Sequence, residues 1–144
     1  MDSDKVVPLL YGMKFRRLLY RQYEPILERY RLHKIDLVIL LYLAGAGGRD
    51  TAGDILGQEM FTRGHISQSL GRLCRKGLIR AERDASDRRC YHNRLTEGCG
   101  EIVDQARDAA GQVERLLFDG LSEEEKRTFS VLAGKVLRNI ERAG

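Results

Sequence analysis

The residues best suited to bind a charged partner lie in one stretch of the sequence, from Thr62 to Thr96. The stretch holds nine Lys or Arg side chains and three acids, a net charge of +6, whereas the whole chain carries +4. Its cations are Arg63, Arg72, Arg75, Lys76, Arg80, Arg83, Arg88, Arg89 and Arg94. The positive charge is therefore local, and a local basic surface is typical of a contact with nucleic-acid phosphates.

The first part of this stretch has the pattern of an amphipathic helix. Thr62 is a good N-cap residue, and Ile66, Leu70 and Leu73 share one helical stripe that would face a core. The opposite face is polar, partly basic and low in bulk, so it suits a surface that lies close against a partner. The candidates for base or phosphate contacts on this helix are Thr62, Arg63, His65, Ser67, Gln68 and Arg72.

A short hairpin is expected directly after this helix. Residues 78–83 and 90–95 have the composition of strands, and Asp84, Ser86 and Asp87 favour a turn between them. The turn ends in Arg88 and Arg89, whose charges no core needs. On an isolated hairpin such a charged run is ordinarily solvated surface. Next to a basic helix it predicts a second contact with the same nucleic acid.

Further helices are expected to position these two elements, which makes the fold class mainly α with one small β-hairpin. Helical periodicity covers residues 5–31, with a kink or break at Pro25, and residues 34–43, which are apolar nearly all round. A short helix begins near Thr51, a long one follows Thr96 as N-cap, and the last follows Ser122. The apolar faces of the terminal helices exceed what one small lobe can cover, which predicts pairing with a second copy of the chain.

The sequence argues against several other classes of protein. We find no nucleophile–base pair, phosphate loop or metal cluster, so we expect no enzyme, catalytic residue, cofactor or metal site. The longest apolar run, Leu37 to Leu43, is far shorter than the ~20 residues of a membrane helix, so we expect no membrane partner. Three cysteines without a CxxC pair and an N-terminus without an export pattern favour a reducing cytoplasm.

Three motifs in register give the chain a family resemblance. One is Asp87-Arg88-Arg89 followed by Leu95-Thr96-Glu97-Gly98, and another is Arg72-Leu73 with Lys76-Gly77-Leu78-Ile79. The third is Leu121-Ser122-Glu123-Glu124-Glu125. Together with the order of the elements, they resemble the multiple-antibiotic-resistance regulator (MarR) family over nearly the whole chain.

The resemblance implies a dimeric winged helix-turn-helix transcription regulator, most often a ligand-responsive repressor, on a pseudo-palindromic operator in double-stranded DNA. It implies a single domain over residues 1–144, with dimerisation helices at about 5–31 and 97–142 and a winged lobe at about 34–96. Asp87 and Arg89 match the wing Asp and Arg of the family, in which the Asp orients the Arg that enters the minor groove, and Arg88 is the adjacent candidate. Relatives respond to small aromatic or anionic effectors, for which Arg16, His33 and Tyr42 are candidate contacts.

One position departs from the family pattern, and two alternatives stay open. Many members carry Arg where this chain has Gln68, and Gln pairs with adenine edges while Arg prefers guanine, so we expect a different base preference there. One alternative is a thiol-based redox sensor, in which Cys99 is the most reactive candidate because helix N-termini lower thiol pKa. The other is a protein-interaction module that keeps the fold without binding DNA.

Overall fold

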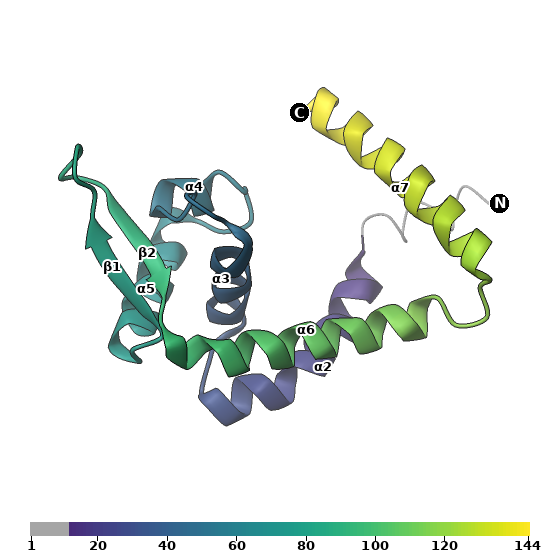
Figure 1. The fold of residues 1–144 in the computed structure, drawn as a ribbon, viewed down its shortest axis with the longest axis horizontal. Coiled ribbons are helices and arrows are strands. Elements are labelled where there is room, and N and C mark those ends of the chain that lie inside the picture. Colours follow the sequence, from purple (N-terminus) through teal and green to yellow (C-terminus); the bar gives the residue numbers. More distant parts are fainter. Residues whose placement is uncertain (1–11) are drawn as a thin grey trace. The chain divides into compact units, whose positions relative to one another are not determined.

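Helices make up most of the computed structural model, which describes residues 12–144 (Figure 1). The chain divides into two units, the first ending at Ala110 and the second beginning at Gly111. A mainly α fold with one two-stranded hairpin confirms the fold class that the sequence predicts. The expected helical turns over residues 5–11 lie outside the described part of the chain.

The elements follow the order that the periodicity predicts. The first unit contains α2 (Met13–Tyr30), α3 (Lys34–Gly45), α4 (Ala52–Leu56), α5 (Arg63–Arg75), β1 (Ile79–Arg83), β2 (Tyr91–Leu95), a 3-10 turn (Glu97–Cys99) and the first part of α6 (Gly100–Leu117). The second unit contains the rest of α6 and α7 (Glu123–Ala143). The predicted break at Pro25 is wrong, because α2 continues through that residue.

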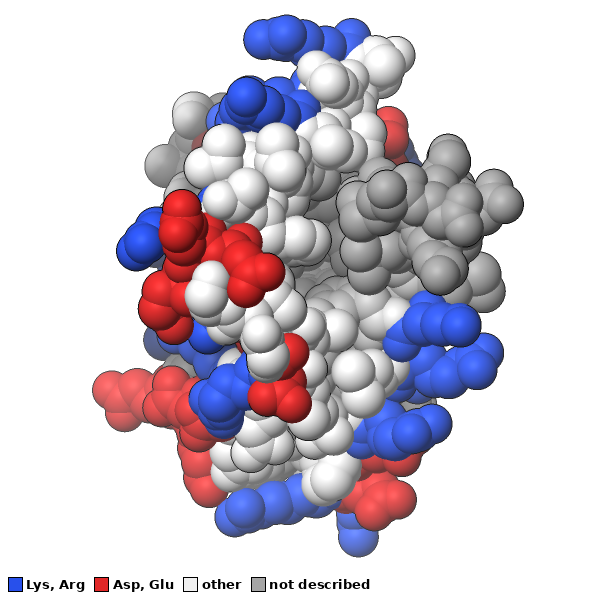
Figure 2. All heavy atoms as spheres, turned by 90° about the vertical axis from the view of Figure 1, so that its right-hand side faces the viewer, with Lys and Arg blue, Asp and Glu red and all other residues white. Residues whose placement is uncertain are grey.

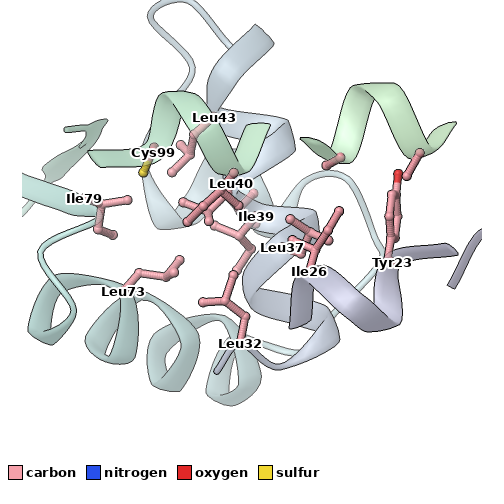
Figure 3. Packing of buried hydrophobic residues seen from close by; sticks show 14 of the residues in the cluster. Tyr23, Ile26, Leu32, Leu37, Ile39, Leu40, Leu43, Leu73, Ile79 and Cys99 are labelled. Atoms are coloured by element: carbon pink, nitrogen blue, oxygen red, sulfur yellow. The ribbon is translucent and has the colours of Figure 1, made fainter. Parts of the chain in front are cut away.

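The apolar helix α3 lies at the centre of the first unit (Figure 3). Leu37, Ile39 and Leu40 are all at most 1% exposed, so α3 is covered on several sides, as its lack of a polar face predicts. Side chains of α2, α5, β1 and α6 complete the same core, among them Ile26, Leu73, Ile79 and Ile102. Burial of these side chains fixes where α5 and the hairpin stand relative to α3.

The inner stripe predicted for α5 is confirmed at two of its three positions. Ile66 and Leu73 are fully buried, whereas Leu70 is half-buried at the edge of the core. Part of the apolar surface that the sequence assigns to pairing is used within the chain, because Ile102 and Ala106 of α6 pack into the core of the first unit. The first turns of α6 therefore cover the chain's own core, and the side-chain amide of Gln105 binds the Tyr30 hydroxyl of α2 at 3.0 Å.

Side chains define the helix starts, with one correction. The capping boxes Thr51–Asp54 and Ser122–Glu125 are both formed, each with reciprocal side-chain and backbone bonds. Thr96, predicted to cap the following helix, makes no such bond. Its hydroxyl instead donates to the Gly77 carbonyl at 2.7 Å. Thr96 therefore ties the end of β2 to the turn after α5, which fixes the base of the hairpin.

Replacement of Leu40 tests whether α3 carries the core. Leu40→Ala removes a side chain with 0% exposure, and deletion of a buried Leu side chain costs about 2–5 kcal/mol. Met60→Ala is the matched control, since Met60 is 57% exposed and its loss should change stability by less than about 0.5 kcal/mol. Urea unfolding at a fixed protein concentration measures both. Equal effects of the two variants would contradict this account of the core.

Candidate nucleic-acid interface

The outward face of α5 carries four of the polar residues predicted to contact DNA. Arg63, His65, Ser67 and Gln68 are all exposed. Thr62 caps the helix, its hydroxyl oxygen accepting the His65 backbone N–H at 3.3 Å. The buried stripe on the other side holds the helix in place, so this polar face stays open to solvent. Such a face can present hydrogen-bonding groups to base edges and a cation to phosphates.

Arg72, the sixth candidate on α5, is engaged inside the protein. Its guanidinium binds the carboxylate of Asp36 on α3, with Nη2 2.8 Å from Oδ1 and Nε 3.3 Å from Oδ2. The Ser69 hydroxyl donates to Oδ1 at 2.6 Å, and the His33 backbone N–H donates to Oδ2 at 2.9 Å. The bidentate arrangement turns the guanidinium toward α3, so the structure gives Arg72 an internal contact in place of the DNA contact that the sequence predicts.

The carboxylate of Asp36 stays charged although it is buried. Burial acts to raise its pKa, but hydrogen bonds from Arg72, Ser69 and the His33 N–H, together with the Arg72 charge, outweigh burial and leave the pKa below its ordinary value. Helical periodicity marks only apolar faces and therefore does not indicate Asp36. The available signal was its place three residues after His33, where an acid closes a capping box.

The tip of the hairpin is a tightly bonded turn. One oxygen of Asp84 accepts the backbone N–H groups of Ser86 at 2.8 Å and Asp87 at 2.9 Å. The Asp87 carboxylate in turn accepts the backbone N–H of Arg89 at 3.0 Å. The turn therefore holds the backbone that carries Arg88 and Arg89, both exposed. Asp87 bonds the backbone of Arg89, whereas the family resemblance implies that this Asp orients the Arg side chain.

The cations of the stretch from Thr62 to Thr96 fall into two groups. Some are engaged locally: Arg83 donates to the Tyr91 hydroxyl at 2.7 Å, and Arg94 pairs with Glu82 at 3.0 Å. Across residues 12–144, by contrast, neither Arg63 nor the two tip arginines has an acid within ion-pair distance. The start of α5 and the tip of the hairpin thus keep cations available for phosphates.

His92 on β2 is a residue that the sequence analysis did not single out. Its ring lies between two carboxylates, with Nδ1 2.5 Å from Asp50 and Nε2 2.6 Å from Asp84. Asp50 lies between α3 and α4, and it is 42 residues from His92 in sequence. No periodicity predicts the contact between His92 and Asp50 over that separation. The contact with Asp84 had a local signal, because an Asp in the turn of a hairpin lies near a His on the following strand.

The three residues proposed for an effector do not line one shared hollow. Arg16 lines an open hollow of about 390 Å³ on α2 with Tyr20 and Lys34, and both cations lie over the Tyr20 ring. His33 and Tyr42 are not part of this hollow. The Tyr42 hydroxyl donates to the Arg49 carbonyl at 2.8 Å, near the far end of α3 from His33. The three residues therefore do not share this hollow, and their assignment to one effector site stays a prediction.

Cys99 is not the reactive thiol that its place in the sequence suggests. Its side chain is buried in the core, and its thiol donates to the Leu78 carbonyl. Burial raises the pKa of the Cys99 thiol, and hydrogen bonds from Thr96 offset this effect only in part. Burial, followed by nearby aspartates, also raises the pKa of Cys90. The expected lowering of the thiol pKa by the helix N-terminus is therefore wrong.

The sequence also predicts neither a metal site nor a membrane-spanning helix. Within residues 12–144, no group of three or more His, Cys, Asp or Glu side chains is placed to hold a metal ion. In the same part of the chain, no helix is both long and apolar enough to cross a membrane.

Comparisons with known proteins agree with this arrangement. Residues 32–99 match the family model of a winged helix DNA-binding domain. Wild-type MarR of E. coli in its apo form is 22% identical with a TM-score of 0.76, over 95% of this chain and 97% of that one. MepR of S. aureus in complex with DNA is 25% identical with a TM-score of 0.62, over 90% and 96%. The organohalide-sensing regulator RdhR bound to 2,4-dichlorophenol is 19% identical with a TM-score of 0.67, over 96% and 81%. No curated protein matches the sequence.

The buried contact of Arg72 and the exposure of Arg63 predict very different losses of stability when each side chain is removed. Arg72→Ala leaves the buried Asp36 charge without its cation, which costs about 3–5 kcal/mol of stability. Arg63→Ala removes an exposed side chain and should change stability by less than about 0.5 kcal/mol. Urea unfolding compares the two at one protein concentration. If Arg72→Ala unfolds at the wild-type midpoint, the buried pair is not an anchor of α5.

Proposed function

Because this chain is a winged-helix transcription regulator of the MarR family, we propose that it binds a pseudo-palindromic operator as a homodimer and acts as a ligand-responsive repressor. The observation that carries this proposal is the pair of exposed cationic sites on one lobe, at the start of α5 and at the hairpin tip. A helix in the major groove and a wing at the flanking minor groove would use these two sites. The complex of MepR with DNA supports the same use of the fold.

We assign base recognition to the exposed polar side chains of α5. Ser67 and Gln68 can exchange hydrogen bonds with base edges, and a Gln amide suits the N6 and N7 atoms of adenine. Arg63 lies in the first turn, where phosphates are attracted both by its charge and by the helix N-terminus. Arg88 and Arg89 then supply the flanking contact. Phosphate contacts position the protein on DNA, and the α5 side chains give it sequence preference.

An uncovered apolar face on α7 supports the homodimer. Leu132, Leu137 and Ile140 share one side of the helix, and each is between 54% and 60% exposed in the single chain. Figure 2 shows uncharged atoms through the middle of this side of the molecule, with charged side chains gathered along its edges. An exposed apolar surface with a charged rim is typical of a protein interface. Two-fold pairing of chains would also place two lobes on the two halves of a palindrome.

Repression and ligand response complete the proposal. A dimer that covers two half-sites in a promoter would exclude polymerase from the same DNA. RdhR has been crystallised with 2,4-dichlorophenol, which supports a small aromatic compound as the class of effector. The hollow beside Arg16, Tyr20 and Lys34 is where we would place an anionic effector first. Binding of an effector would weaken the DNA complex by favouring a spacing of the two lobes that fits the operator poorly.

Replacement of Arg89 tests the wing contact. Arg89→Ala removes one exposed cation from the hairpin tip and should lower the slope of log Kd against log salt by about 0.9, because one phosphate contact is lost. Fluorescence anisotropy with duplexes from the region upstream of the protein's own gene measures the slope at several salt concentrations. Arg94→Ala is the control, since Arg94 already pairs with Glu82.

Two outcomes of that experiment would count against the proposal. An unchanged slope in Arg89→Ala would remove Arg89 from the DNA contact. If the wild-type protein binds no upstream duplex more tightly than an unrelated duplex, the proposal of an operator upstream of its own gene fails. The alternative of a protein-interaction module that does not bind DNA would then be favoured.

Replacement of Leu137 tests the homodimer. Leu137→Glu places a charge in the middle of the apolar face of α7, and burial of an unpaired carboxylate in an apolar interface is strongly unfavourable. We expect sedimentation to shift from dimer to monomer at micromolar concentrations, with operator affinity lost in parallel. Arg138→Glu, one residue further and on the opposite side of the helix, is the control and should remain dimeric. A variant that stays dimeric would place the interface elsewhere.

A further inference from the structure

The strongest feature outside the DNA-facing residues is the bridge that His92 makes between the hairpin tip and the body of the lobe. The imidazole is three-quarters buried on β2, and each ring nitrogen contacts a carboxylate, Asp50 on one side and Asp84 on the other. A carboxylate only accepts hydrogen bonds, and a neutral imidazole has only one N–H to donate. Two carboxylates are therefore satisfied together only when His92 is the doubly protonated imidazolium.

Each of the two carboxylates is tied to a different part of the lobe. The Asp50 backbone carbonyl accepts both the backbone N–H and the side-chain amide of Asn93, at 3.0 and 2.9 Å, and both residues are buried. Asp50 is thus part of the body of the lobe. Asp84 is part of the turn, because its other oxygen accepts the backbone N–H groups of Ser86 and Asp87. His92 joins the body of the lobe at Asp50 to the turn at Asp84, and this turn leads into the backbone that carries Arg88 and Arg89.

We propose that protonated His92 is a positioning residue for the wing, which sets the hairpin tip so that Arg88 and Arg89 reach DNA, and that loss of its proton weakens DNA binding. The inference rests on the proposed function, because it assigns a consequence to DNA contacts at the tip. When the imidazolium loses a proton, one ring nitrogen becomes an acceptor facing a carboxylate, and that contact turns from attractive to repulsive. The tip is then held to the body of the lobe by one bond fewer.

The charges around the ring decide the direction of the pH effect. Asp54 on α4 interacts with His92 by charge, Glu82 stands directly across the ladder on β1, and the charge of Arg49, next to Asp50, acts on Asp54. Glu82 is itself paired with Arg94. The hydrogen bonds with Asp84 and then Asp50 raise the pKa of His92, and burial opposes this only in part. The bond from His92, followed by those from the turn, holds the pKa of Asp84 well below its ordinary value.

The sign of the effect follows from these two shifts. A raised His pKa means that the contribution of His92 to the folded lobe is complete below the unfolded value of about 6.5 and is lost as pH rises through the folded pKa. A lowered Asp pKa means that the contribution of Asp84 is lost only in acid, well below pH 4. The bridge is therefore complete at mildly acidic pH and is lost as pH rises through the raised pKa of His92.

The chain contains two other histidines, and both are exposed. His65 is on the outward face of α5, and His33 directly precedes α3. A fall in DNA affinity as pH rises therefore does not by itself identify His92 as the group responsible. The pH profile must depend on His92 and on its two carboxylates.

The first arm of the test measures DNA affinity. Anisotropy with a labelled duplex from the upstream region, at fixed ionic strength between pH 6 and 9, should show affinity falling roughly tenfold in the wild type, about the effect of one well-placed contact. His92→Asn should bind more weakly at pH 6 and lose most of this fall. Asp84→Asn, which keeps the acceptor for the turn but not the charge, should shift the midpoint to lower pH. His65→Asn should retain the fall at reduced affinity.

The second arm needs no DNA. In NMR spectra of the full chain, the backbone amides of Arg88 and Arg89 should titrate with the same midpoint as the His92 ring, and this coupling should vanish in His92→Asn. Identical pH profiles in wild type and His92→Asn, or tip amides that do not follow the ring, would overturn the inference. If the wild type binds no fragment at pH 6, the operator proposal fails, and the NMR midpoints alone decide whether His92 positions the wing.

Discussion

The buried carboxylate of Asp36 is the contact on which the DNA-facing geometry depends. It is a full charge with 0% exposure of its residue, placed at the start of the most apolar helix of the chain. Such a group is tolerated only when its hydrogen bonds and its charge are both satisfied, and here the donors are on α5 and at the residue before α3. Two of them, Ser69 and Arg72, belong to α5. The requirement to satisfy Asp36 therefore fixes the rotation of α5 about its own axis.

Fixing that rotation also decides which face of α5 reaches solvent. With Ser69 and Arg72 turned toward α3, the residues on the other side, among them Ser67 and Gln68, are exposed. A purely apolar contact would hold the helix less specifically, because Ile66 and Leu73 can tolerate a range of small rotations. A bidentate pair with a third hydrogen bond has directional requirements that such packing lacks. The apolar stripe of α5 thus buries the helix against the core, and the hydrogen bonds of Ser69 and Arg72 to Asp36 fix its rotation.

The sequence predicts the elements well and their mutual contacts poorly. Periodicity and capping residues located the helices, the hairpin and the buried Ile66 and Leu73, because those signals are local. Arg72 was assigned to DNA because its spacing places it near the polar face, and nothing in the spacing shows that Asp36, 36 residues earlier, lies within 2.8 Å.

The same limit explains the remaining differences. His92 and Asp50 meet only after the hairpin packs against the loop before α4, so no local pattern marks them as a pair. Cys99 ends the 3-10 turn and directly precedes α6, but its side chain turns into the core, and burial outweighs the effect of the helix end on the thiol. Net charge misleads in a similar way. The stretch from Thr62 to Thr96 carries +6, yet Arg72 and Arg94 are neutralised by acids of the chain itself.

The two DNA-facing elements are held by anchors that respond differently to protons. The α5 anchor pairs a guanidinium, which stays charged at any ordinary pH, with a carboxylate whose pKa is lowered, so it does not change near neutrality. The wing anchor depends on an imidazole, the side chain that changes charge closest to neutral pH. Loss of the His92 proton would leave the base-reading helix in place while the hairpin tip loses one of its supports. Under the proposed function, in which α5 contacts the bases and the wing contacts mainly phosphates, sequence preference would then be kept while affinity falls. Under the same proposal, the protein would release DNA without first losing the α5 contacts that recognise the operator.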